Sequence, residues 1–322
     1  MIEVRNLTRR YGERTAVDSL DFTIERGRIY GFLGPNGAGK STTLNMITGC
    51  LAATEGTVTV DGYDIIEDAE EAKKRIGYLP ELPPVYQDMT VREYLTFVAE
   101  AKSVKKGAAK SQIEKAMQLT EIEDYADRLI RHMSKGYKQR VGIAQALIGD
   151  PEVIILDEPT VGLDPKQIIG IRELIRSLGK THTVILSSHI LAEVRAVCDH
   201  VIIISHGRIV ANDTPENLES VLAGENQLDI VVKTDEKTAT SILLAIDSVE
   251  RVAAKENDDS TIALTVTSKN GADIREAVFF AFADKRLPIL HMEQKLASLE
   301  EVFLELTDSE SADAPIPEEE EV

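Results

Sequence analysis

The chain has 322 residues, a length that predicts one large domain followed by a smaller one rather than a single compact core. Hydrophobic residues make up 43% of the chain and charged residues 28%, proportions typical of a folded globular protein. The net charge of -19 disfavours binding to nucleic-acid phosphates, and the longest uncharged stretch, Ser41 to Thr54, is too short to span a membrane. We therefore expect a cytoplasmic protein without a nucleic-acid partner.

The first part of the chain has the pattern of two strands followed by a strand, a loop and a helix. Two alternating runs, Ile2 to Leu7 and Val17 to Ile24, flank the turn-like sequence YGER and predict a pair of antiparallel strands. Ile29 to Leu33 then predicts a short buried strand, and Thr42 to Leu51 has helical composition. The glycine-rich segment between these last two elements is therefore predicted to be the loop that joins them.

A helical segment and further strands follow. Apolar residues recur three and four positions apart from Thr90 to about Gly149, which predicts a helical insert at about residues 83–149. Apolar strands are then predicted to alternate with helices near residues 166–179 and 190–198; these strands are Val153 to Leu156, Val184 to Leu186 and Val201 to Ile204. Strands that are apolar throughout indicate a parallel sheet covered on both faces, so the predicted fold class is α/β.

The last third of the chain has a different rhythm. After a polar break at Ala223 to Gln227, the pattern predicts strand 228–234, helix 236–246, strands 249–255 and 260–267, helix 271–283 and strand 288–293. This order predicts a small ferredoxin-like α+β domain, ending in a helix through LEEVFLEL. The predicted boundaries are 1–224 for the first domain, 225–307 for the accessory domain and 308–322 for an acidic tail that is expected to be disordered.

The glycine-rich loop matches GxxxxGK[ST], the pattern of a phosphate-binding P-loop, between a predicted strand and a predicted helix. Gly37 and Gly39 let the backbone turn its N–H groups toward phosphates, and the positive end of the following helix faces the same charge. Lys40 is predicted to reach the terminal phosphates of a nucleotide, and the Ser41 hydroxyl to bind Mg²⁺. The predicted nucleotide contacts of this loop are Gly34, Pro35, Asn36, Gly37, Ala38, Gly39, Lys40, Ser41 and Thr42.

Polar residues at the ends of two later strands complete the predicted site. Asp157 follows the apolar run VIIL and is predicted to bind Mg²⁺, since a P-loop nucleotide needs a carboxylate at a neighbouring strand end. Glu158 comes next, and a turn of the chain there allows it to act as the general base toward the attacking water. His189 ends the strand TVILSS, where it is predicted to contact the γ-phosphate.

With these residues in place, roughly residues 1 to 220 resemble the nucleotide-binding domain of the ABC transporter superfamily. MSKGYKQR at 133–140 resembles the signature sequence of that family, GLD at 162–164 its D-loop, and SSH ending at His189 its switch histidine. Tyr11 lies where the family stacks an aromatic ring on adenine. The resemblance implies the fold of an ABC-type P-loop NTPase, with a parallel sheet core, an antiparallel β subdomain and a helical subdomain.

The same resemblance implies how the chain works. Ser134, Lys135 and Gly136 of one subunit would touch the ATP held by the P-loop of another, so the chain would act as a homodimer or as a heterodimer with a related ATPase subunit. Asp164 would help to couple the two sites. ATP hydrolysis with Mg²⁺ would drive a separate transmembrane permease, which places the chain on the cytoplasmic face of the membrane. The ending LASLEEVFLELT resembles subunits of ABC-2 type exporters, and an importer subunit is the alternative.

Two positions depart from the usual family pattern. The signature keeps its serine and second glycine but has Lys135 and Tyr137 at other positions, so phosphate contact should persist. Glu81 stands where the Q-loop normally carries glutamine. Its carboxylate can still bind Mg²⁺, but it adds negative charge near the triphosphate, so slower turnover is expected.

Two other classes of protein share parts of this pattern. A DNA-associated ATPase of the SMC and Rad50 type carries a long coiled coil before its signature, and no sustained heptads occur between Glu81 and Met133. A P-loop kinase explains Lys40 and Asp157, but it leaves the signature, the D-loop and His189 together without a role. The ABC ATPase is therefore the preferred interpretation.

Overall fold

The structure, a computed structural model, describes residues 1–222, 227–255, 261–269 and 272–295. The described chain divides into two compact units, one of which spans Met1–Pro215 while the other begins at Glu216. The predicted helix through LEEVFLEL and the acidic tail lie outside the described residues. No helix in the described ranges is both long and apolar enough to cross a membrane.

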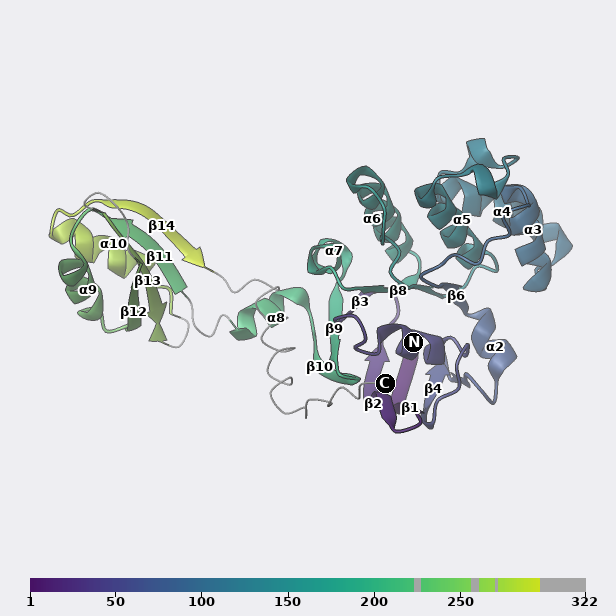
Figure 1. The fold of residues 1–322 in the computed structure, drawn as a ribbon, viewed down its shortest axis with the longest axis horizontal. Helices are drawn as coiled ribbons and strands as arrows, with labels where there is room; N and C mark the ends of the chain where they lie inside the picture. Colours follow the sequence, from purple (N-terminus) through teal and green to yellow (C-terminus); the bar gives the residue numbers. More distant parts are fainter. Residues whose placement is uncertain (223–226, 256–260, 270–271, 296–322) are drawn as a thin grey trace, which may run out of the picture. The chain divides into compact units, whose positions relative to one another are not determined.

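The first unit contains an antiparallel sheet with the strand order β2-β1-β4-β5 (Figure 1). Its strands are β1 (Ile2–Tyr11), β2 (Arg14–Ile24), β4 (Glu55–Val60) and β5 (Tyr63–Asp64). The predicted antiparallel pair is confirmed, and both of its strands extend to a tight turn at Gly12, whose φ of 58° is left-handed. β4 and β5 were not predicted, because β5 has only two residues and the alternation of β4 is limited to Thr57 to Val60.

A second sheet of six strands, ordered β10-β9-β3-β8-β7-β6, forms the centre of the unit. All neighbours are parallel except β10, which pairs antiparallel to β9. The strands are β3 (Ile29–Leu33), β6 (Ile76–Leu79), β7 (Val153–Leu156), β8 (Thr183–Ser188), β9 (His200–Ser205) and β10 (Arg208–Asp213). The parallel sheet was predicted from its fully apolar strands, and each residue of β3, β7 and β8 is indeed buried.

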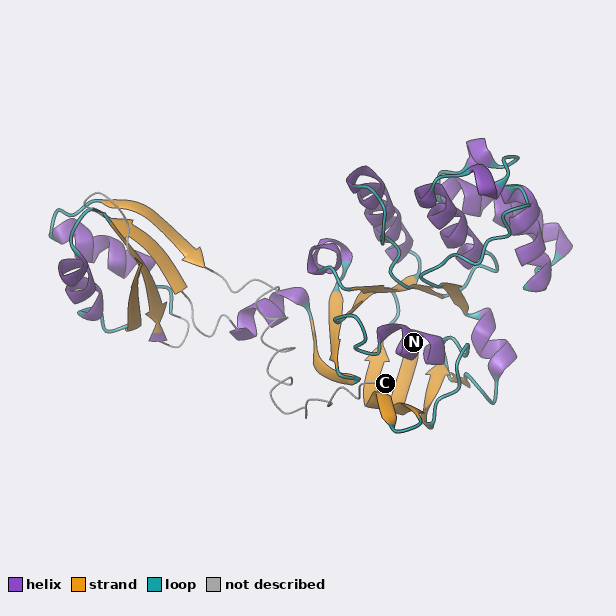
Figure 2. Ribbon diagram, in the orientation of Figure 1, coloured by secondary structure: helices purple, strands orange, loops and turns teal. Residues whose placement is uncertain are grey.

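Helices cover the parallel sheet on one face, and the antiparallel sheet with α1 lies on the other (Figure 2). The helices of this unit are α1 (Lys40–Ile47), α2 (Ala69–Lys74), α3 (Val91–Ala101), α4 (Lys106–Leu119), α5 (Lys135–Leu147), α6 (Pro165–Gly179) and α7 (Leu191–Val197). Thr90 starts α3 with a capping box to Glu93. The predicted helical insert therefore consists mainly of α3, α4 and α5.

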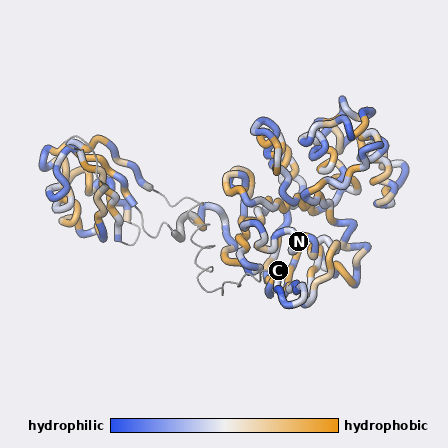
Figure 3. Tube along the Cα trace, viewed as in Figure 1, coloured by the Kyte–Doolittle hydropathy of each residue, from blue (hydrophilic) through white to orange (hydrophobic). Residues whose placement is uncertain are grey.

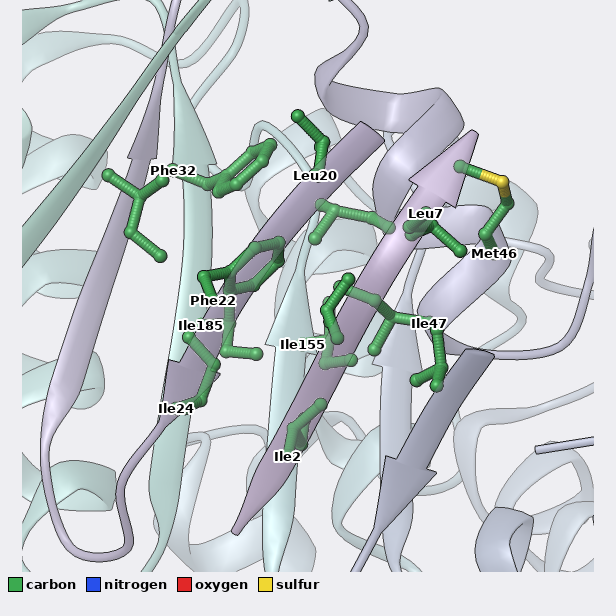
Figure 4. Packing of buried hydrophobic residues seen from close by; sticks show 14 of the residues in the cluster. Ile2, Leu7, Leu20, Phe22, Ile24, Phe32, Met46, Ile47, Ile155 and Ile185 are labelled. Atoms are coloured by element: carbon green, nitrogen blue, oxygen red, sulfur yellow. The ribbon is translucent and has the colours of Figure 1, made fainter. Parts of the chain in front are cut away.

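The main core lies between the two sheets and holds α1 in place (Figure 4). Phe22 from the antiparallel sheet packs beside Phe32 from β3, with ring centroids 6.0 Å apart. Met46 and Ile47 of α1 are fully buried in the same cluster. In Figure 3, where the trace is coloured by hydropathy, parts of the strands that border this core are orange, that is, hydrophobic. Because each large apolar side chain contributes roughly 1.5–3 kcal/mol when buried, this core fixes the start of α1 firmly.

The second unit has the predicted order of elements. Its strands and helices are β11 (Gln227–Val232), α9 (Glu236–Leu244), β12 (Val249–Lys255), β13 (Ile262–Ser268), α10 (Arg275–Asp284) and β14 (Ile289–Lys295), preceded by α8 (Pro215–Leu222). The sheet order β12-β13-β11-β14, antiparallel throughout, is that of a ferredoxin-like fold. Leu264, Val278 and Phe282 are among its buried core residues.

Candidate functional site

The P-loop joins β3 to α1, and two of its glycines, Gly34 and Gly39, are required by the close approach of other backbone segments. A Cβ atom on Gly34 would lie 2.4 Å from the carbonyl oxygen of Ile204. Gly39 has a φ of 106°, and a Cβ atom there would lie 2.7 Å from the carbonyl oxygen of Ala16. Gly39 is also the N-cap of α1 and provides no side-chain cap, so the first N–H groups of this helix can serve an anion.

Lys40 is buried at the start of α1, with only 6% of its surface exposed. Its Nζ donates hydrogen bonds to the carbonyl oxygens of Gly34, at 2.7 Å, and Pro35, at 3.2 Å. The same Nζ lies 3.5 Å from Oε1 of Glu158. The loop thus bends back over its own lysine, which holds the ammonium group beside the carboxylate that follows β7.

Two carboxylates follow β7, and a serine of the neighbouring strand β8 binds the segment that carries them. The Ser187 hydroxyl donates to Asp157, which is 2% exposed, and accepts the backbone N–H of Glu158 at 2.8 Å. Glu158 has a left-handed φ of 48°, a conformation that costs a non-glycine residue roughly 1–2 kcal/mol. This turn ends the alternation of the strand, as the sequence analysis expected, and the Glu158 carboxylate lies beside Lys40.

His189 follows β8 directly and is part of the same group. Its Nδ1 lies 3.0 Å from Oε2 of Glu158. Because a carboxylate oxygen accepts hydrogen bonds, Nδ1 carries the proton in this contact, and Nε2 remains available for another partner. Glu158 therefore contacts Lys40 through one oxygen and His189 through the other.

A cavity of about 690 Å³ opens over the P-loop, large enough for a nucleotide. It is lined by Tyr11, Arg14, Ala16, Asn36, Gly37, Gly39, Lys40, Ser41, Thr42, Glu81, Glu158, Val161 and His189. The structure thus brings most of the predicted residues to one cavity, while Gly34, Pro35, Ala38 and Asp157 are not among its lining residues. Arg14, Ala16 and Val161 were not predicted. Arg14 and Ala16 belong to β2, whose packing beside the P-loop has no local signal, and Val161 is a single apolar residue in the loop that follows Glu158.

Tyr11 lies at the end of β1 with 48% of its surface exposed. The guanidinium carbon of Arg9 lies 4.6 Å from the centre of its ring, a cation–π contact. A hydrogen bond of 2.9 Å from Arg9 to the carbonyl oxygen of Ala52 holds the guanidinium in this position. Arg9 therefore supports the ring of Tyr11 at the edge of the cavity.

The predicted signature and D-loop residues lie outside the lining of this cavity, at the starts of α5 and α6. Ser134 is the N-cap of α5 and accepts the N–H of Tyr137, and Asp164 caps α6 by accepting the N–H of Gln167. The two helix starts are packed together, because a Cβ atom on Gly136 would lie 2.6 Å from the side chain of Gln167. Ser134 and Lys135 themselves are exposed.

The oxygen atoms around the P-loop suit a small divalent cation. Ser41 and Glu81 line the cavity, and Asp157 lies at the strand end beside Glu158. No group of three or more histidine, cysteine or acidic side chains within the described ranges could hold a metal ion. Mg²⁺ commonly binds to only one or two protein oxygens together with the phosphates of a nucleotide, and the oxygens of Ser41, Glu81 and Asp157 fit that mode of binding.

A P-loop before a buried helix, a histidine at the end of the neighbouring strand β8 and acidic residues at the end of β7, one strand further, define a P-loop ATPase with the cassette architecture. The family model described as "ABC transporter" matches residues 17–161. The linearmycin resistance ATP-binding protein LnrL of Bacillus subtilis (strain 168) is 32% identical over 308 residues, which cover 95% of this chain and 98% of that protein.

Two further comparisons agree with this class. The Nod factor export ATP-binding protein I of Ralstonia nicotianae is 33% identical, and the match covers 97% of this chain and 95% of that protein. The dimeric structure of a post-hydrolysis state of an ATP-binding cassette bound to ADP and Pi superposes with a TM-score of 0.60 at 26% identity, covering 66% of this chain and 98% of that one. The chain belongs to the ABC transporter family, in which it is an ATP-binding subunit with ATPase activity.

Proposed function

We propose that Glu158 is the general base of ATP hydrolysis and that His189 orients it and contacts the γ-phosphate. The observation that carries this proposal is the contact of Glu158 with both Lys40, at 3.5 Å, and His189, at 3.0 Å, in the wall of one cavity. A carboxylate in this position can accept a proton from water as the water attacks the phosphorus atom.

The other residues of the cavity are assigned to binding. Lys40 and the N–H groups at the start of α1 neutralise the phosphates, and Tyr11 stacks on the adenine ring. Ser41 and Asp157 are assigned as ligands of Mg²⁺, with Glu81 as an additional oxygen ligand. The charge of Mg²⁺ would neutralise the negative charge that develops on the phosphate oxygens during hydrolysis. When a nucleotide binds, the ammonium group of Lys40 must exchange its hydrogen bonds to the carbonyl oxygens of Gly34 and Pro35 for hydrogen bonds to phosphate oxygens.

The residues at the starts of α5 and α6 are assigned to contacts with the second subunit of a dimer. Ser134, Lys135 and Gly136 lie at a helix N-terminus, which favours an anion, but they do not line the cavity of their own chain. In the proposed dimer they bind the γ-phosphate held by the partner, and Asp164 links the two sites. Two chains would then enclose two ATP molecules.

We further propose that the chain powers export through a separate permease at the cytoplasmic face of the membrane. Relatives along nearly the full length are a resistance protein and an export protein by name, which favours export over import. An exposed apolar group lies between the Glu81 loop and α3: Leu82 is 79% exposed, and Tyr86 packs against Phe97 at 5.3 Å. Such a patch suits a protein partner.

The variant Glu158→Gln tests the central assignment, because it keeps the shape of the side chain and removes its ability to take a proton. We expect hydrolysis to fall by roughly two orders of magnitude or more, while ATP still binds and now holds a stable dimer. Phosphate release and light scattering after size exclusion measure the two effects. Glu100→Gln, at an exposed position, is the control, and near-parental turnover of Glu158→Gln would reject Glu158 as the base.

A further inference from the structure

A buried glutamate on α7 binds two hydroxyl groups near the proposed catalytic pair. Glu193 is only 2% exposed. Its Oε2 accepts hydrogen bonds from Thr160, at 2.5 Å, and from Ser188, at 3.1 Å. Arg172 of α6 is the nearest cation, with a nitrogen 3.9 Å from Oε1. One carboxylate oxygen thus joins the loop after β7 to the end of β8.

These two segments are the ones that carry Glu158 and His189. Thr160 lies two residues after Glu158, and Ser188 directly precedes His189. Ser188 is itself fixed at its other side, since its oxygen accepts the N–H of Ile190 at 3.0 Å. The sheet and the contacts of Ser187 already join the two strand ends, and the bridge through Glu193 adds a second link that sets the spacing of Thr160 and Ser188. A change in that spacing would move the Glu158 carboxylate relative to the His189 ring.

The energetics make a purely structural role a poor explanation for Glu193. Burying a carboxylate is costly unless it is well paired, and hydrophobic residues of similar volume often replace buried ion pairs without loss of stability. Here the pairing is incomplete, because Oε1 of Glu193 and Nε of Arg172 are buried and have no hydrogen-bond partner among the described residues. A carboxylate oxygen is nevertheless well suited to this point, since it can accept both hydroxyl groups at once.

We propose that Glu193 is a positioning residue for ATP hydrolysis, which holds Glu158 and His189 at their mutual distance through Thr160 and Ser188. This inference rests on the proposed roles of Glu158 and His189. Glu193 does not line the cavity, so it acts on the rate of the chemical step and not on nucleotide affinity. Misplacing a catalytic group by about 1 Å can lower the rate on the order of 10²-fold.

The test uses the full chain with Glu193→Met, which has a similar size and removes both acceptor oxygens. We expect kcat to fall at least about tenfold, with the dissociation constant of ATP, measured by calorimetry in EDTA, unchanged within about twofold. Glu193→Gln should stay within about threefold of the parental kcat, because its amide oxygen can still accept both hydroxyl groups. The matched control is Glu173→Met, at an exposed glutamate beside Arg172 on α6, which should keep the parental values. Parental kcat in Glu193→Met would overturn the inference.

A second measurement separates positioning from general destabilisation. In a His189→Ala background the catalytic pair is already broken, so Glu193→Met should lower kcat further by less than about threefold. An undiminished loss in that background would instead point to damage unrelated to the pair and would overturn the inference. If Glu193→Met does not fold, Thr160→Val and Ser188→Ala remove the two bridging hydroxyl groups separately, and parental kcat in both gives the same negative answer.

These results can be told apart from a failure of the proposed function. If Glu158→Gln hydrolyses ATP like the parent, the assignment of the base is wrong whatever Glu193 does. If Glu158→Gln is inactive and Glu193→Met is fully active, only the positioning role is wrong.

Discussion

We call the residues Lys40, Glu158 and His189 the P-loop face, and Ser134 to Gly136 with Asp164 the signature face. The residues of the P-loop face already contact one another in a single chain, whereas those of the signature face do not form a site by themselves. On the P-loop face, Lys40, Glu158 and His189 come from three different elements and already contact one another within one chain. On the signature face, Ser134 and Asp164 only cap their own helices, and their neighbours are other residues of the same face. The chemical groups are thus assembled in each subunit, whereas in the proposed dimer the signature face contacts only the ATP that the partner subunit holds.

This difference separates what each face contributes. In the proposed dimer, a P-loop face without a partner's signature face would bind ATP but lack the contacts of the signature residues with the γ-phosphate. A signature face alone lacks Lys40, Glu158 and His189, to which hydrolysis is assigned. Substitutions on the two faces should therefore fail at different steps, and the following predictions run from the largest expected effect to the smallest.

Lys40→Ala should cause the largest loss. Removing the buried ammonium weakens ATP binding and the stabilisation of transition-state charge together, so hydrolysis should fall by at least about 10²-fold and ATP should no longer close the dimer. ATP affinity is measured by calorimetry and turnover by phosphate release, with Lys180→Ala on an exposed turn as control. Unchanged affinity and rate would show that the loop does not bind phosphate.

Mixing two inactive variants tests the division between the faces directly. Ser134→Arg disables the signature face and keeps the P-loop face, whereas Lys40→Ala does the reverse. Each alone should be nearly inactive, but a mixed dimer contains one complete site, so an equal mixture should recover roughly one quarter of parental turnover. No recovery despite mixed dimers, shown with two affinity tags, would contradict composite sites shared between subunits.

Glu81 should have a smaller effect of the opposite sign. Glu81→Gln removes one negative charge near the triphosphate but keeps an oxygen ligand, so basal hydrolysis without the permease should rise a few-fold. Glu81→Ala removes the ligand as well and should lose Mg²⁺-dependent activity. Initial rates over a Mg²⁺ titration distinguish the two. Parental behaviour of both variants would assign Glu81 to an exposed loop without a role at the site.

Asp61 provides a change in stability that should leave both faces intact. Burial opposes ionisation of this carboxyl, but hydrogen bonds with Glu152, the Met1 amino group and Arg26 outweigh it, so its pKa lies below the ordinary value of 3.8. A lowered pKa in the folded state means that the stabilisation exists above pH 3.8 and is lost as the pH falls further.

Asp61→Asn should accordingly lower the free energy of unfolding at pH 7 by about 1–3 kcal/mol. The difference from the parent should shrink as the pH falls below about 4, where the parent itself loses the ionised carboxylate. Urea denaturation at several pH values measures this, and kcat at pH 7 should remain parental. A difference that is constant from pH 7 to pH 3 would exclude the ionised carboxylate as its source.

The sequence predicted those parts of the molecule whose signal is local. The P-loop, the acidic strand end and His189 each stand in one short segment next to an apolar strand, so their positions could be inferred before the fold was known. Arg14 lies opposite Tyr11 in the predicted β1–β2 pair, but the packing of β2 beside the P-loop, which brings Arg14 into the cavity, has no local signature. Glu193 was missed for another reason: one acidic residue in a short helix has the pattern of a solvent-exposed position, and only the packing of α7 buries it.

The support of Tyr11 by Arg9 has a consequence for nucleotide choice. In the proposed binding mode, Tyr11 stacks on the base with the part of its ring that the guanidinium leaves open. Stacking depends on the face of the base and tolerates different edges, because every nucleobase has a π-face. We therefore expect the proposed site to accept GTP as well as ATP.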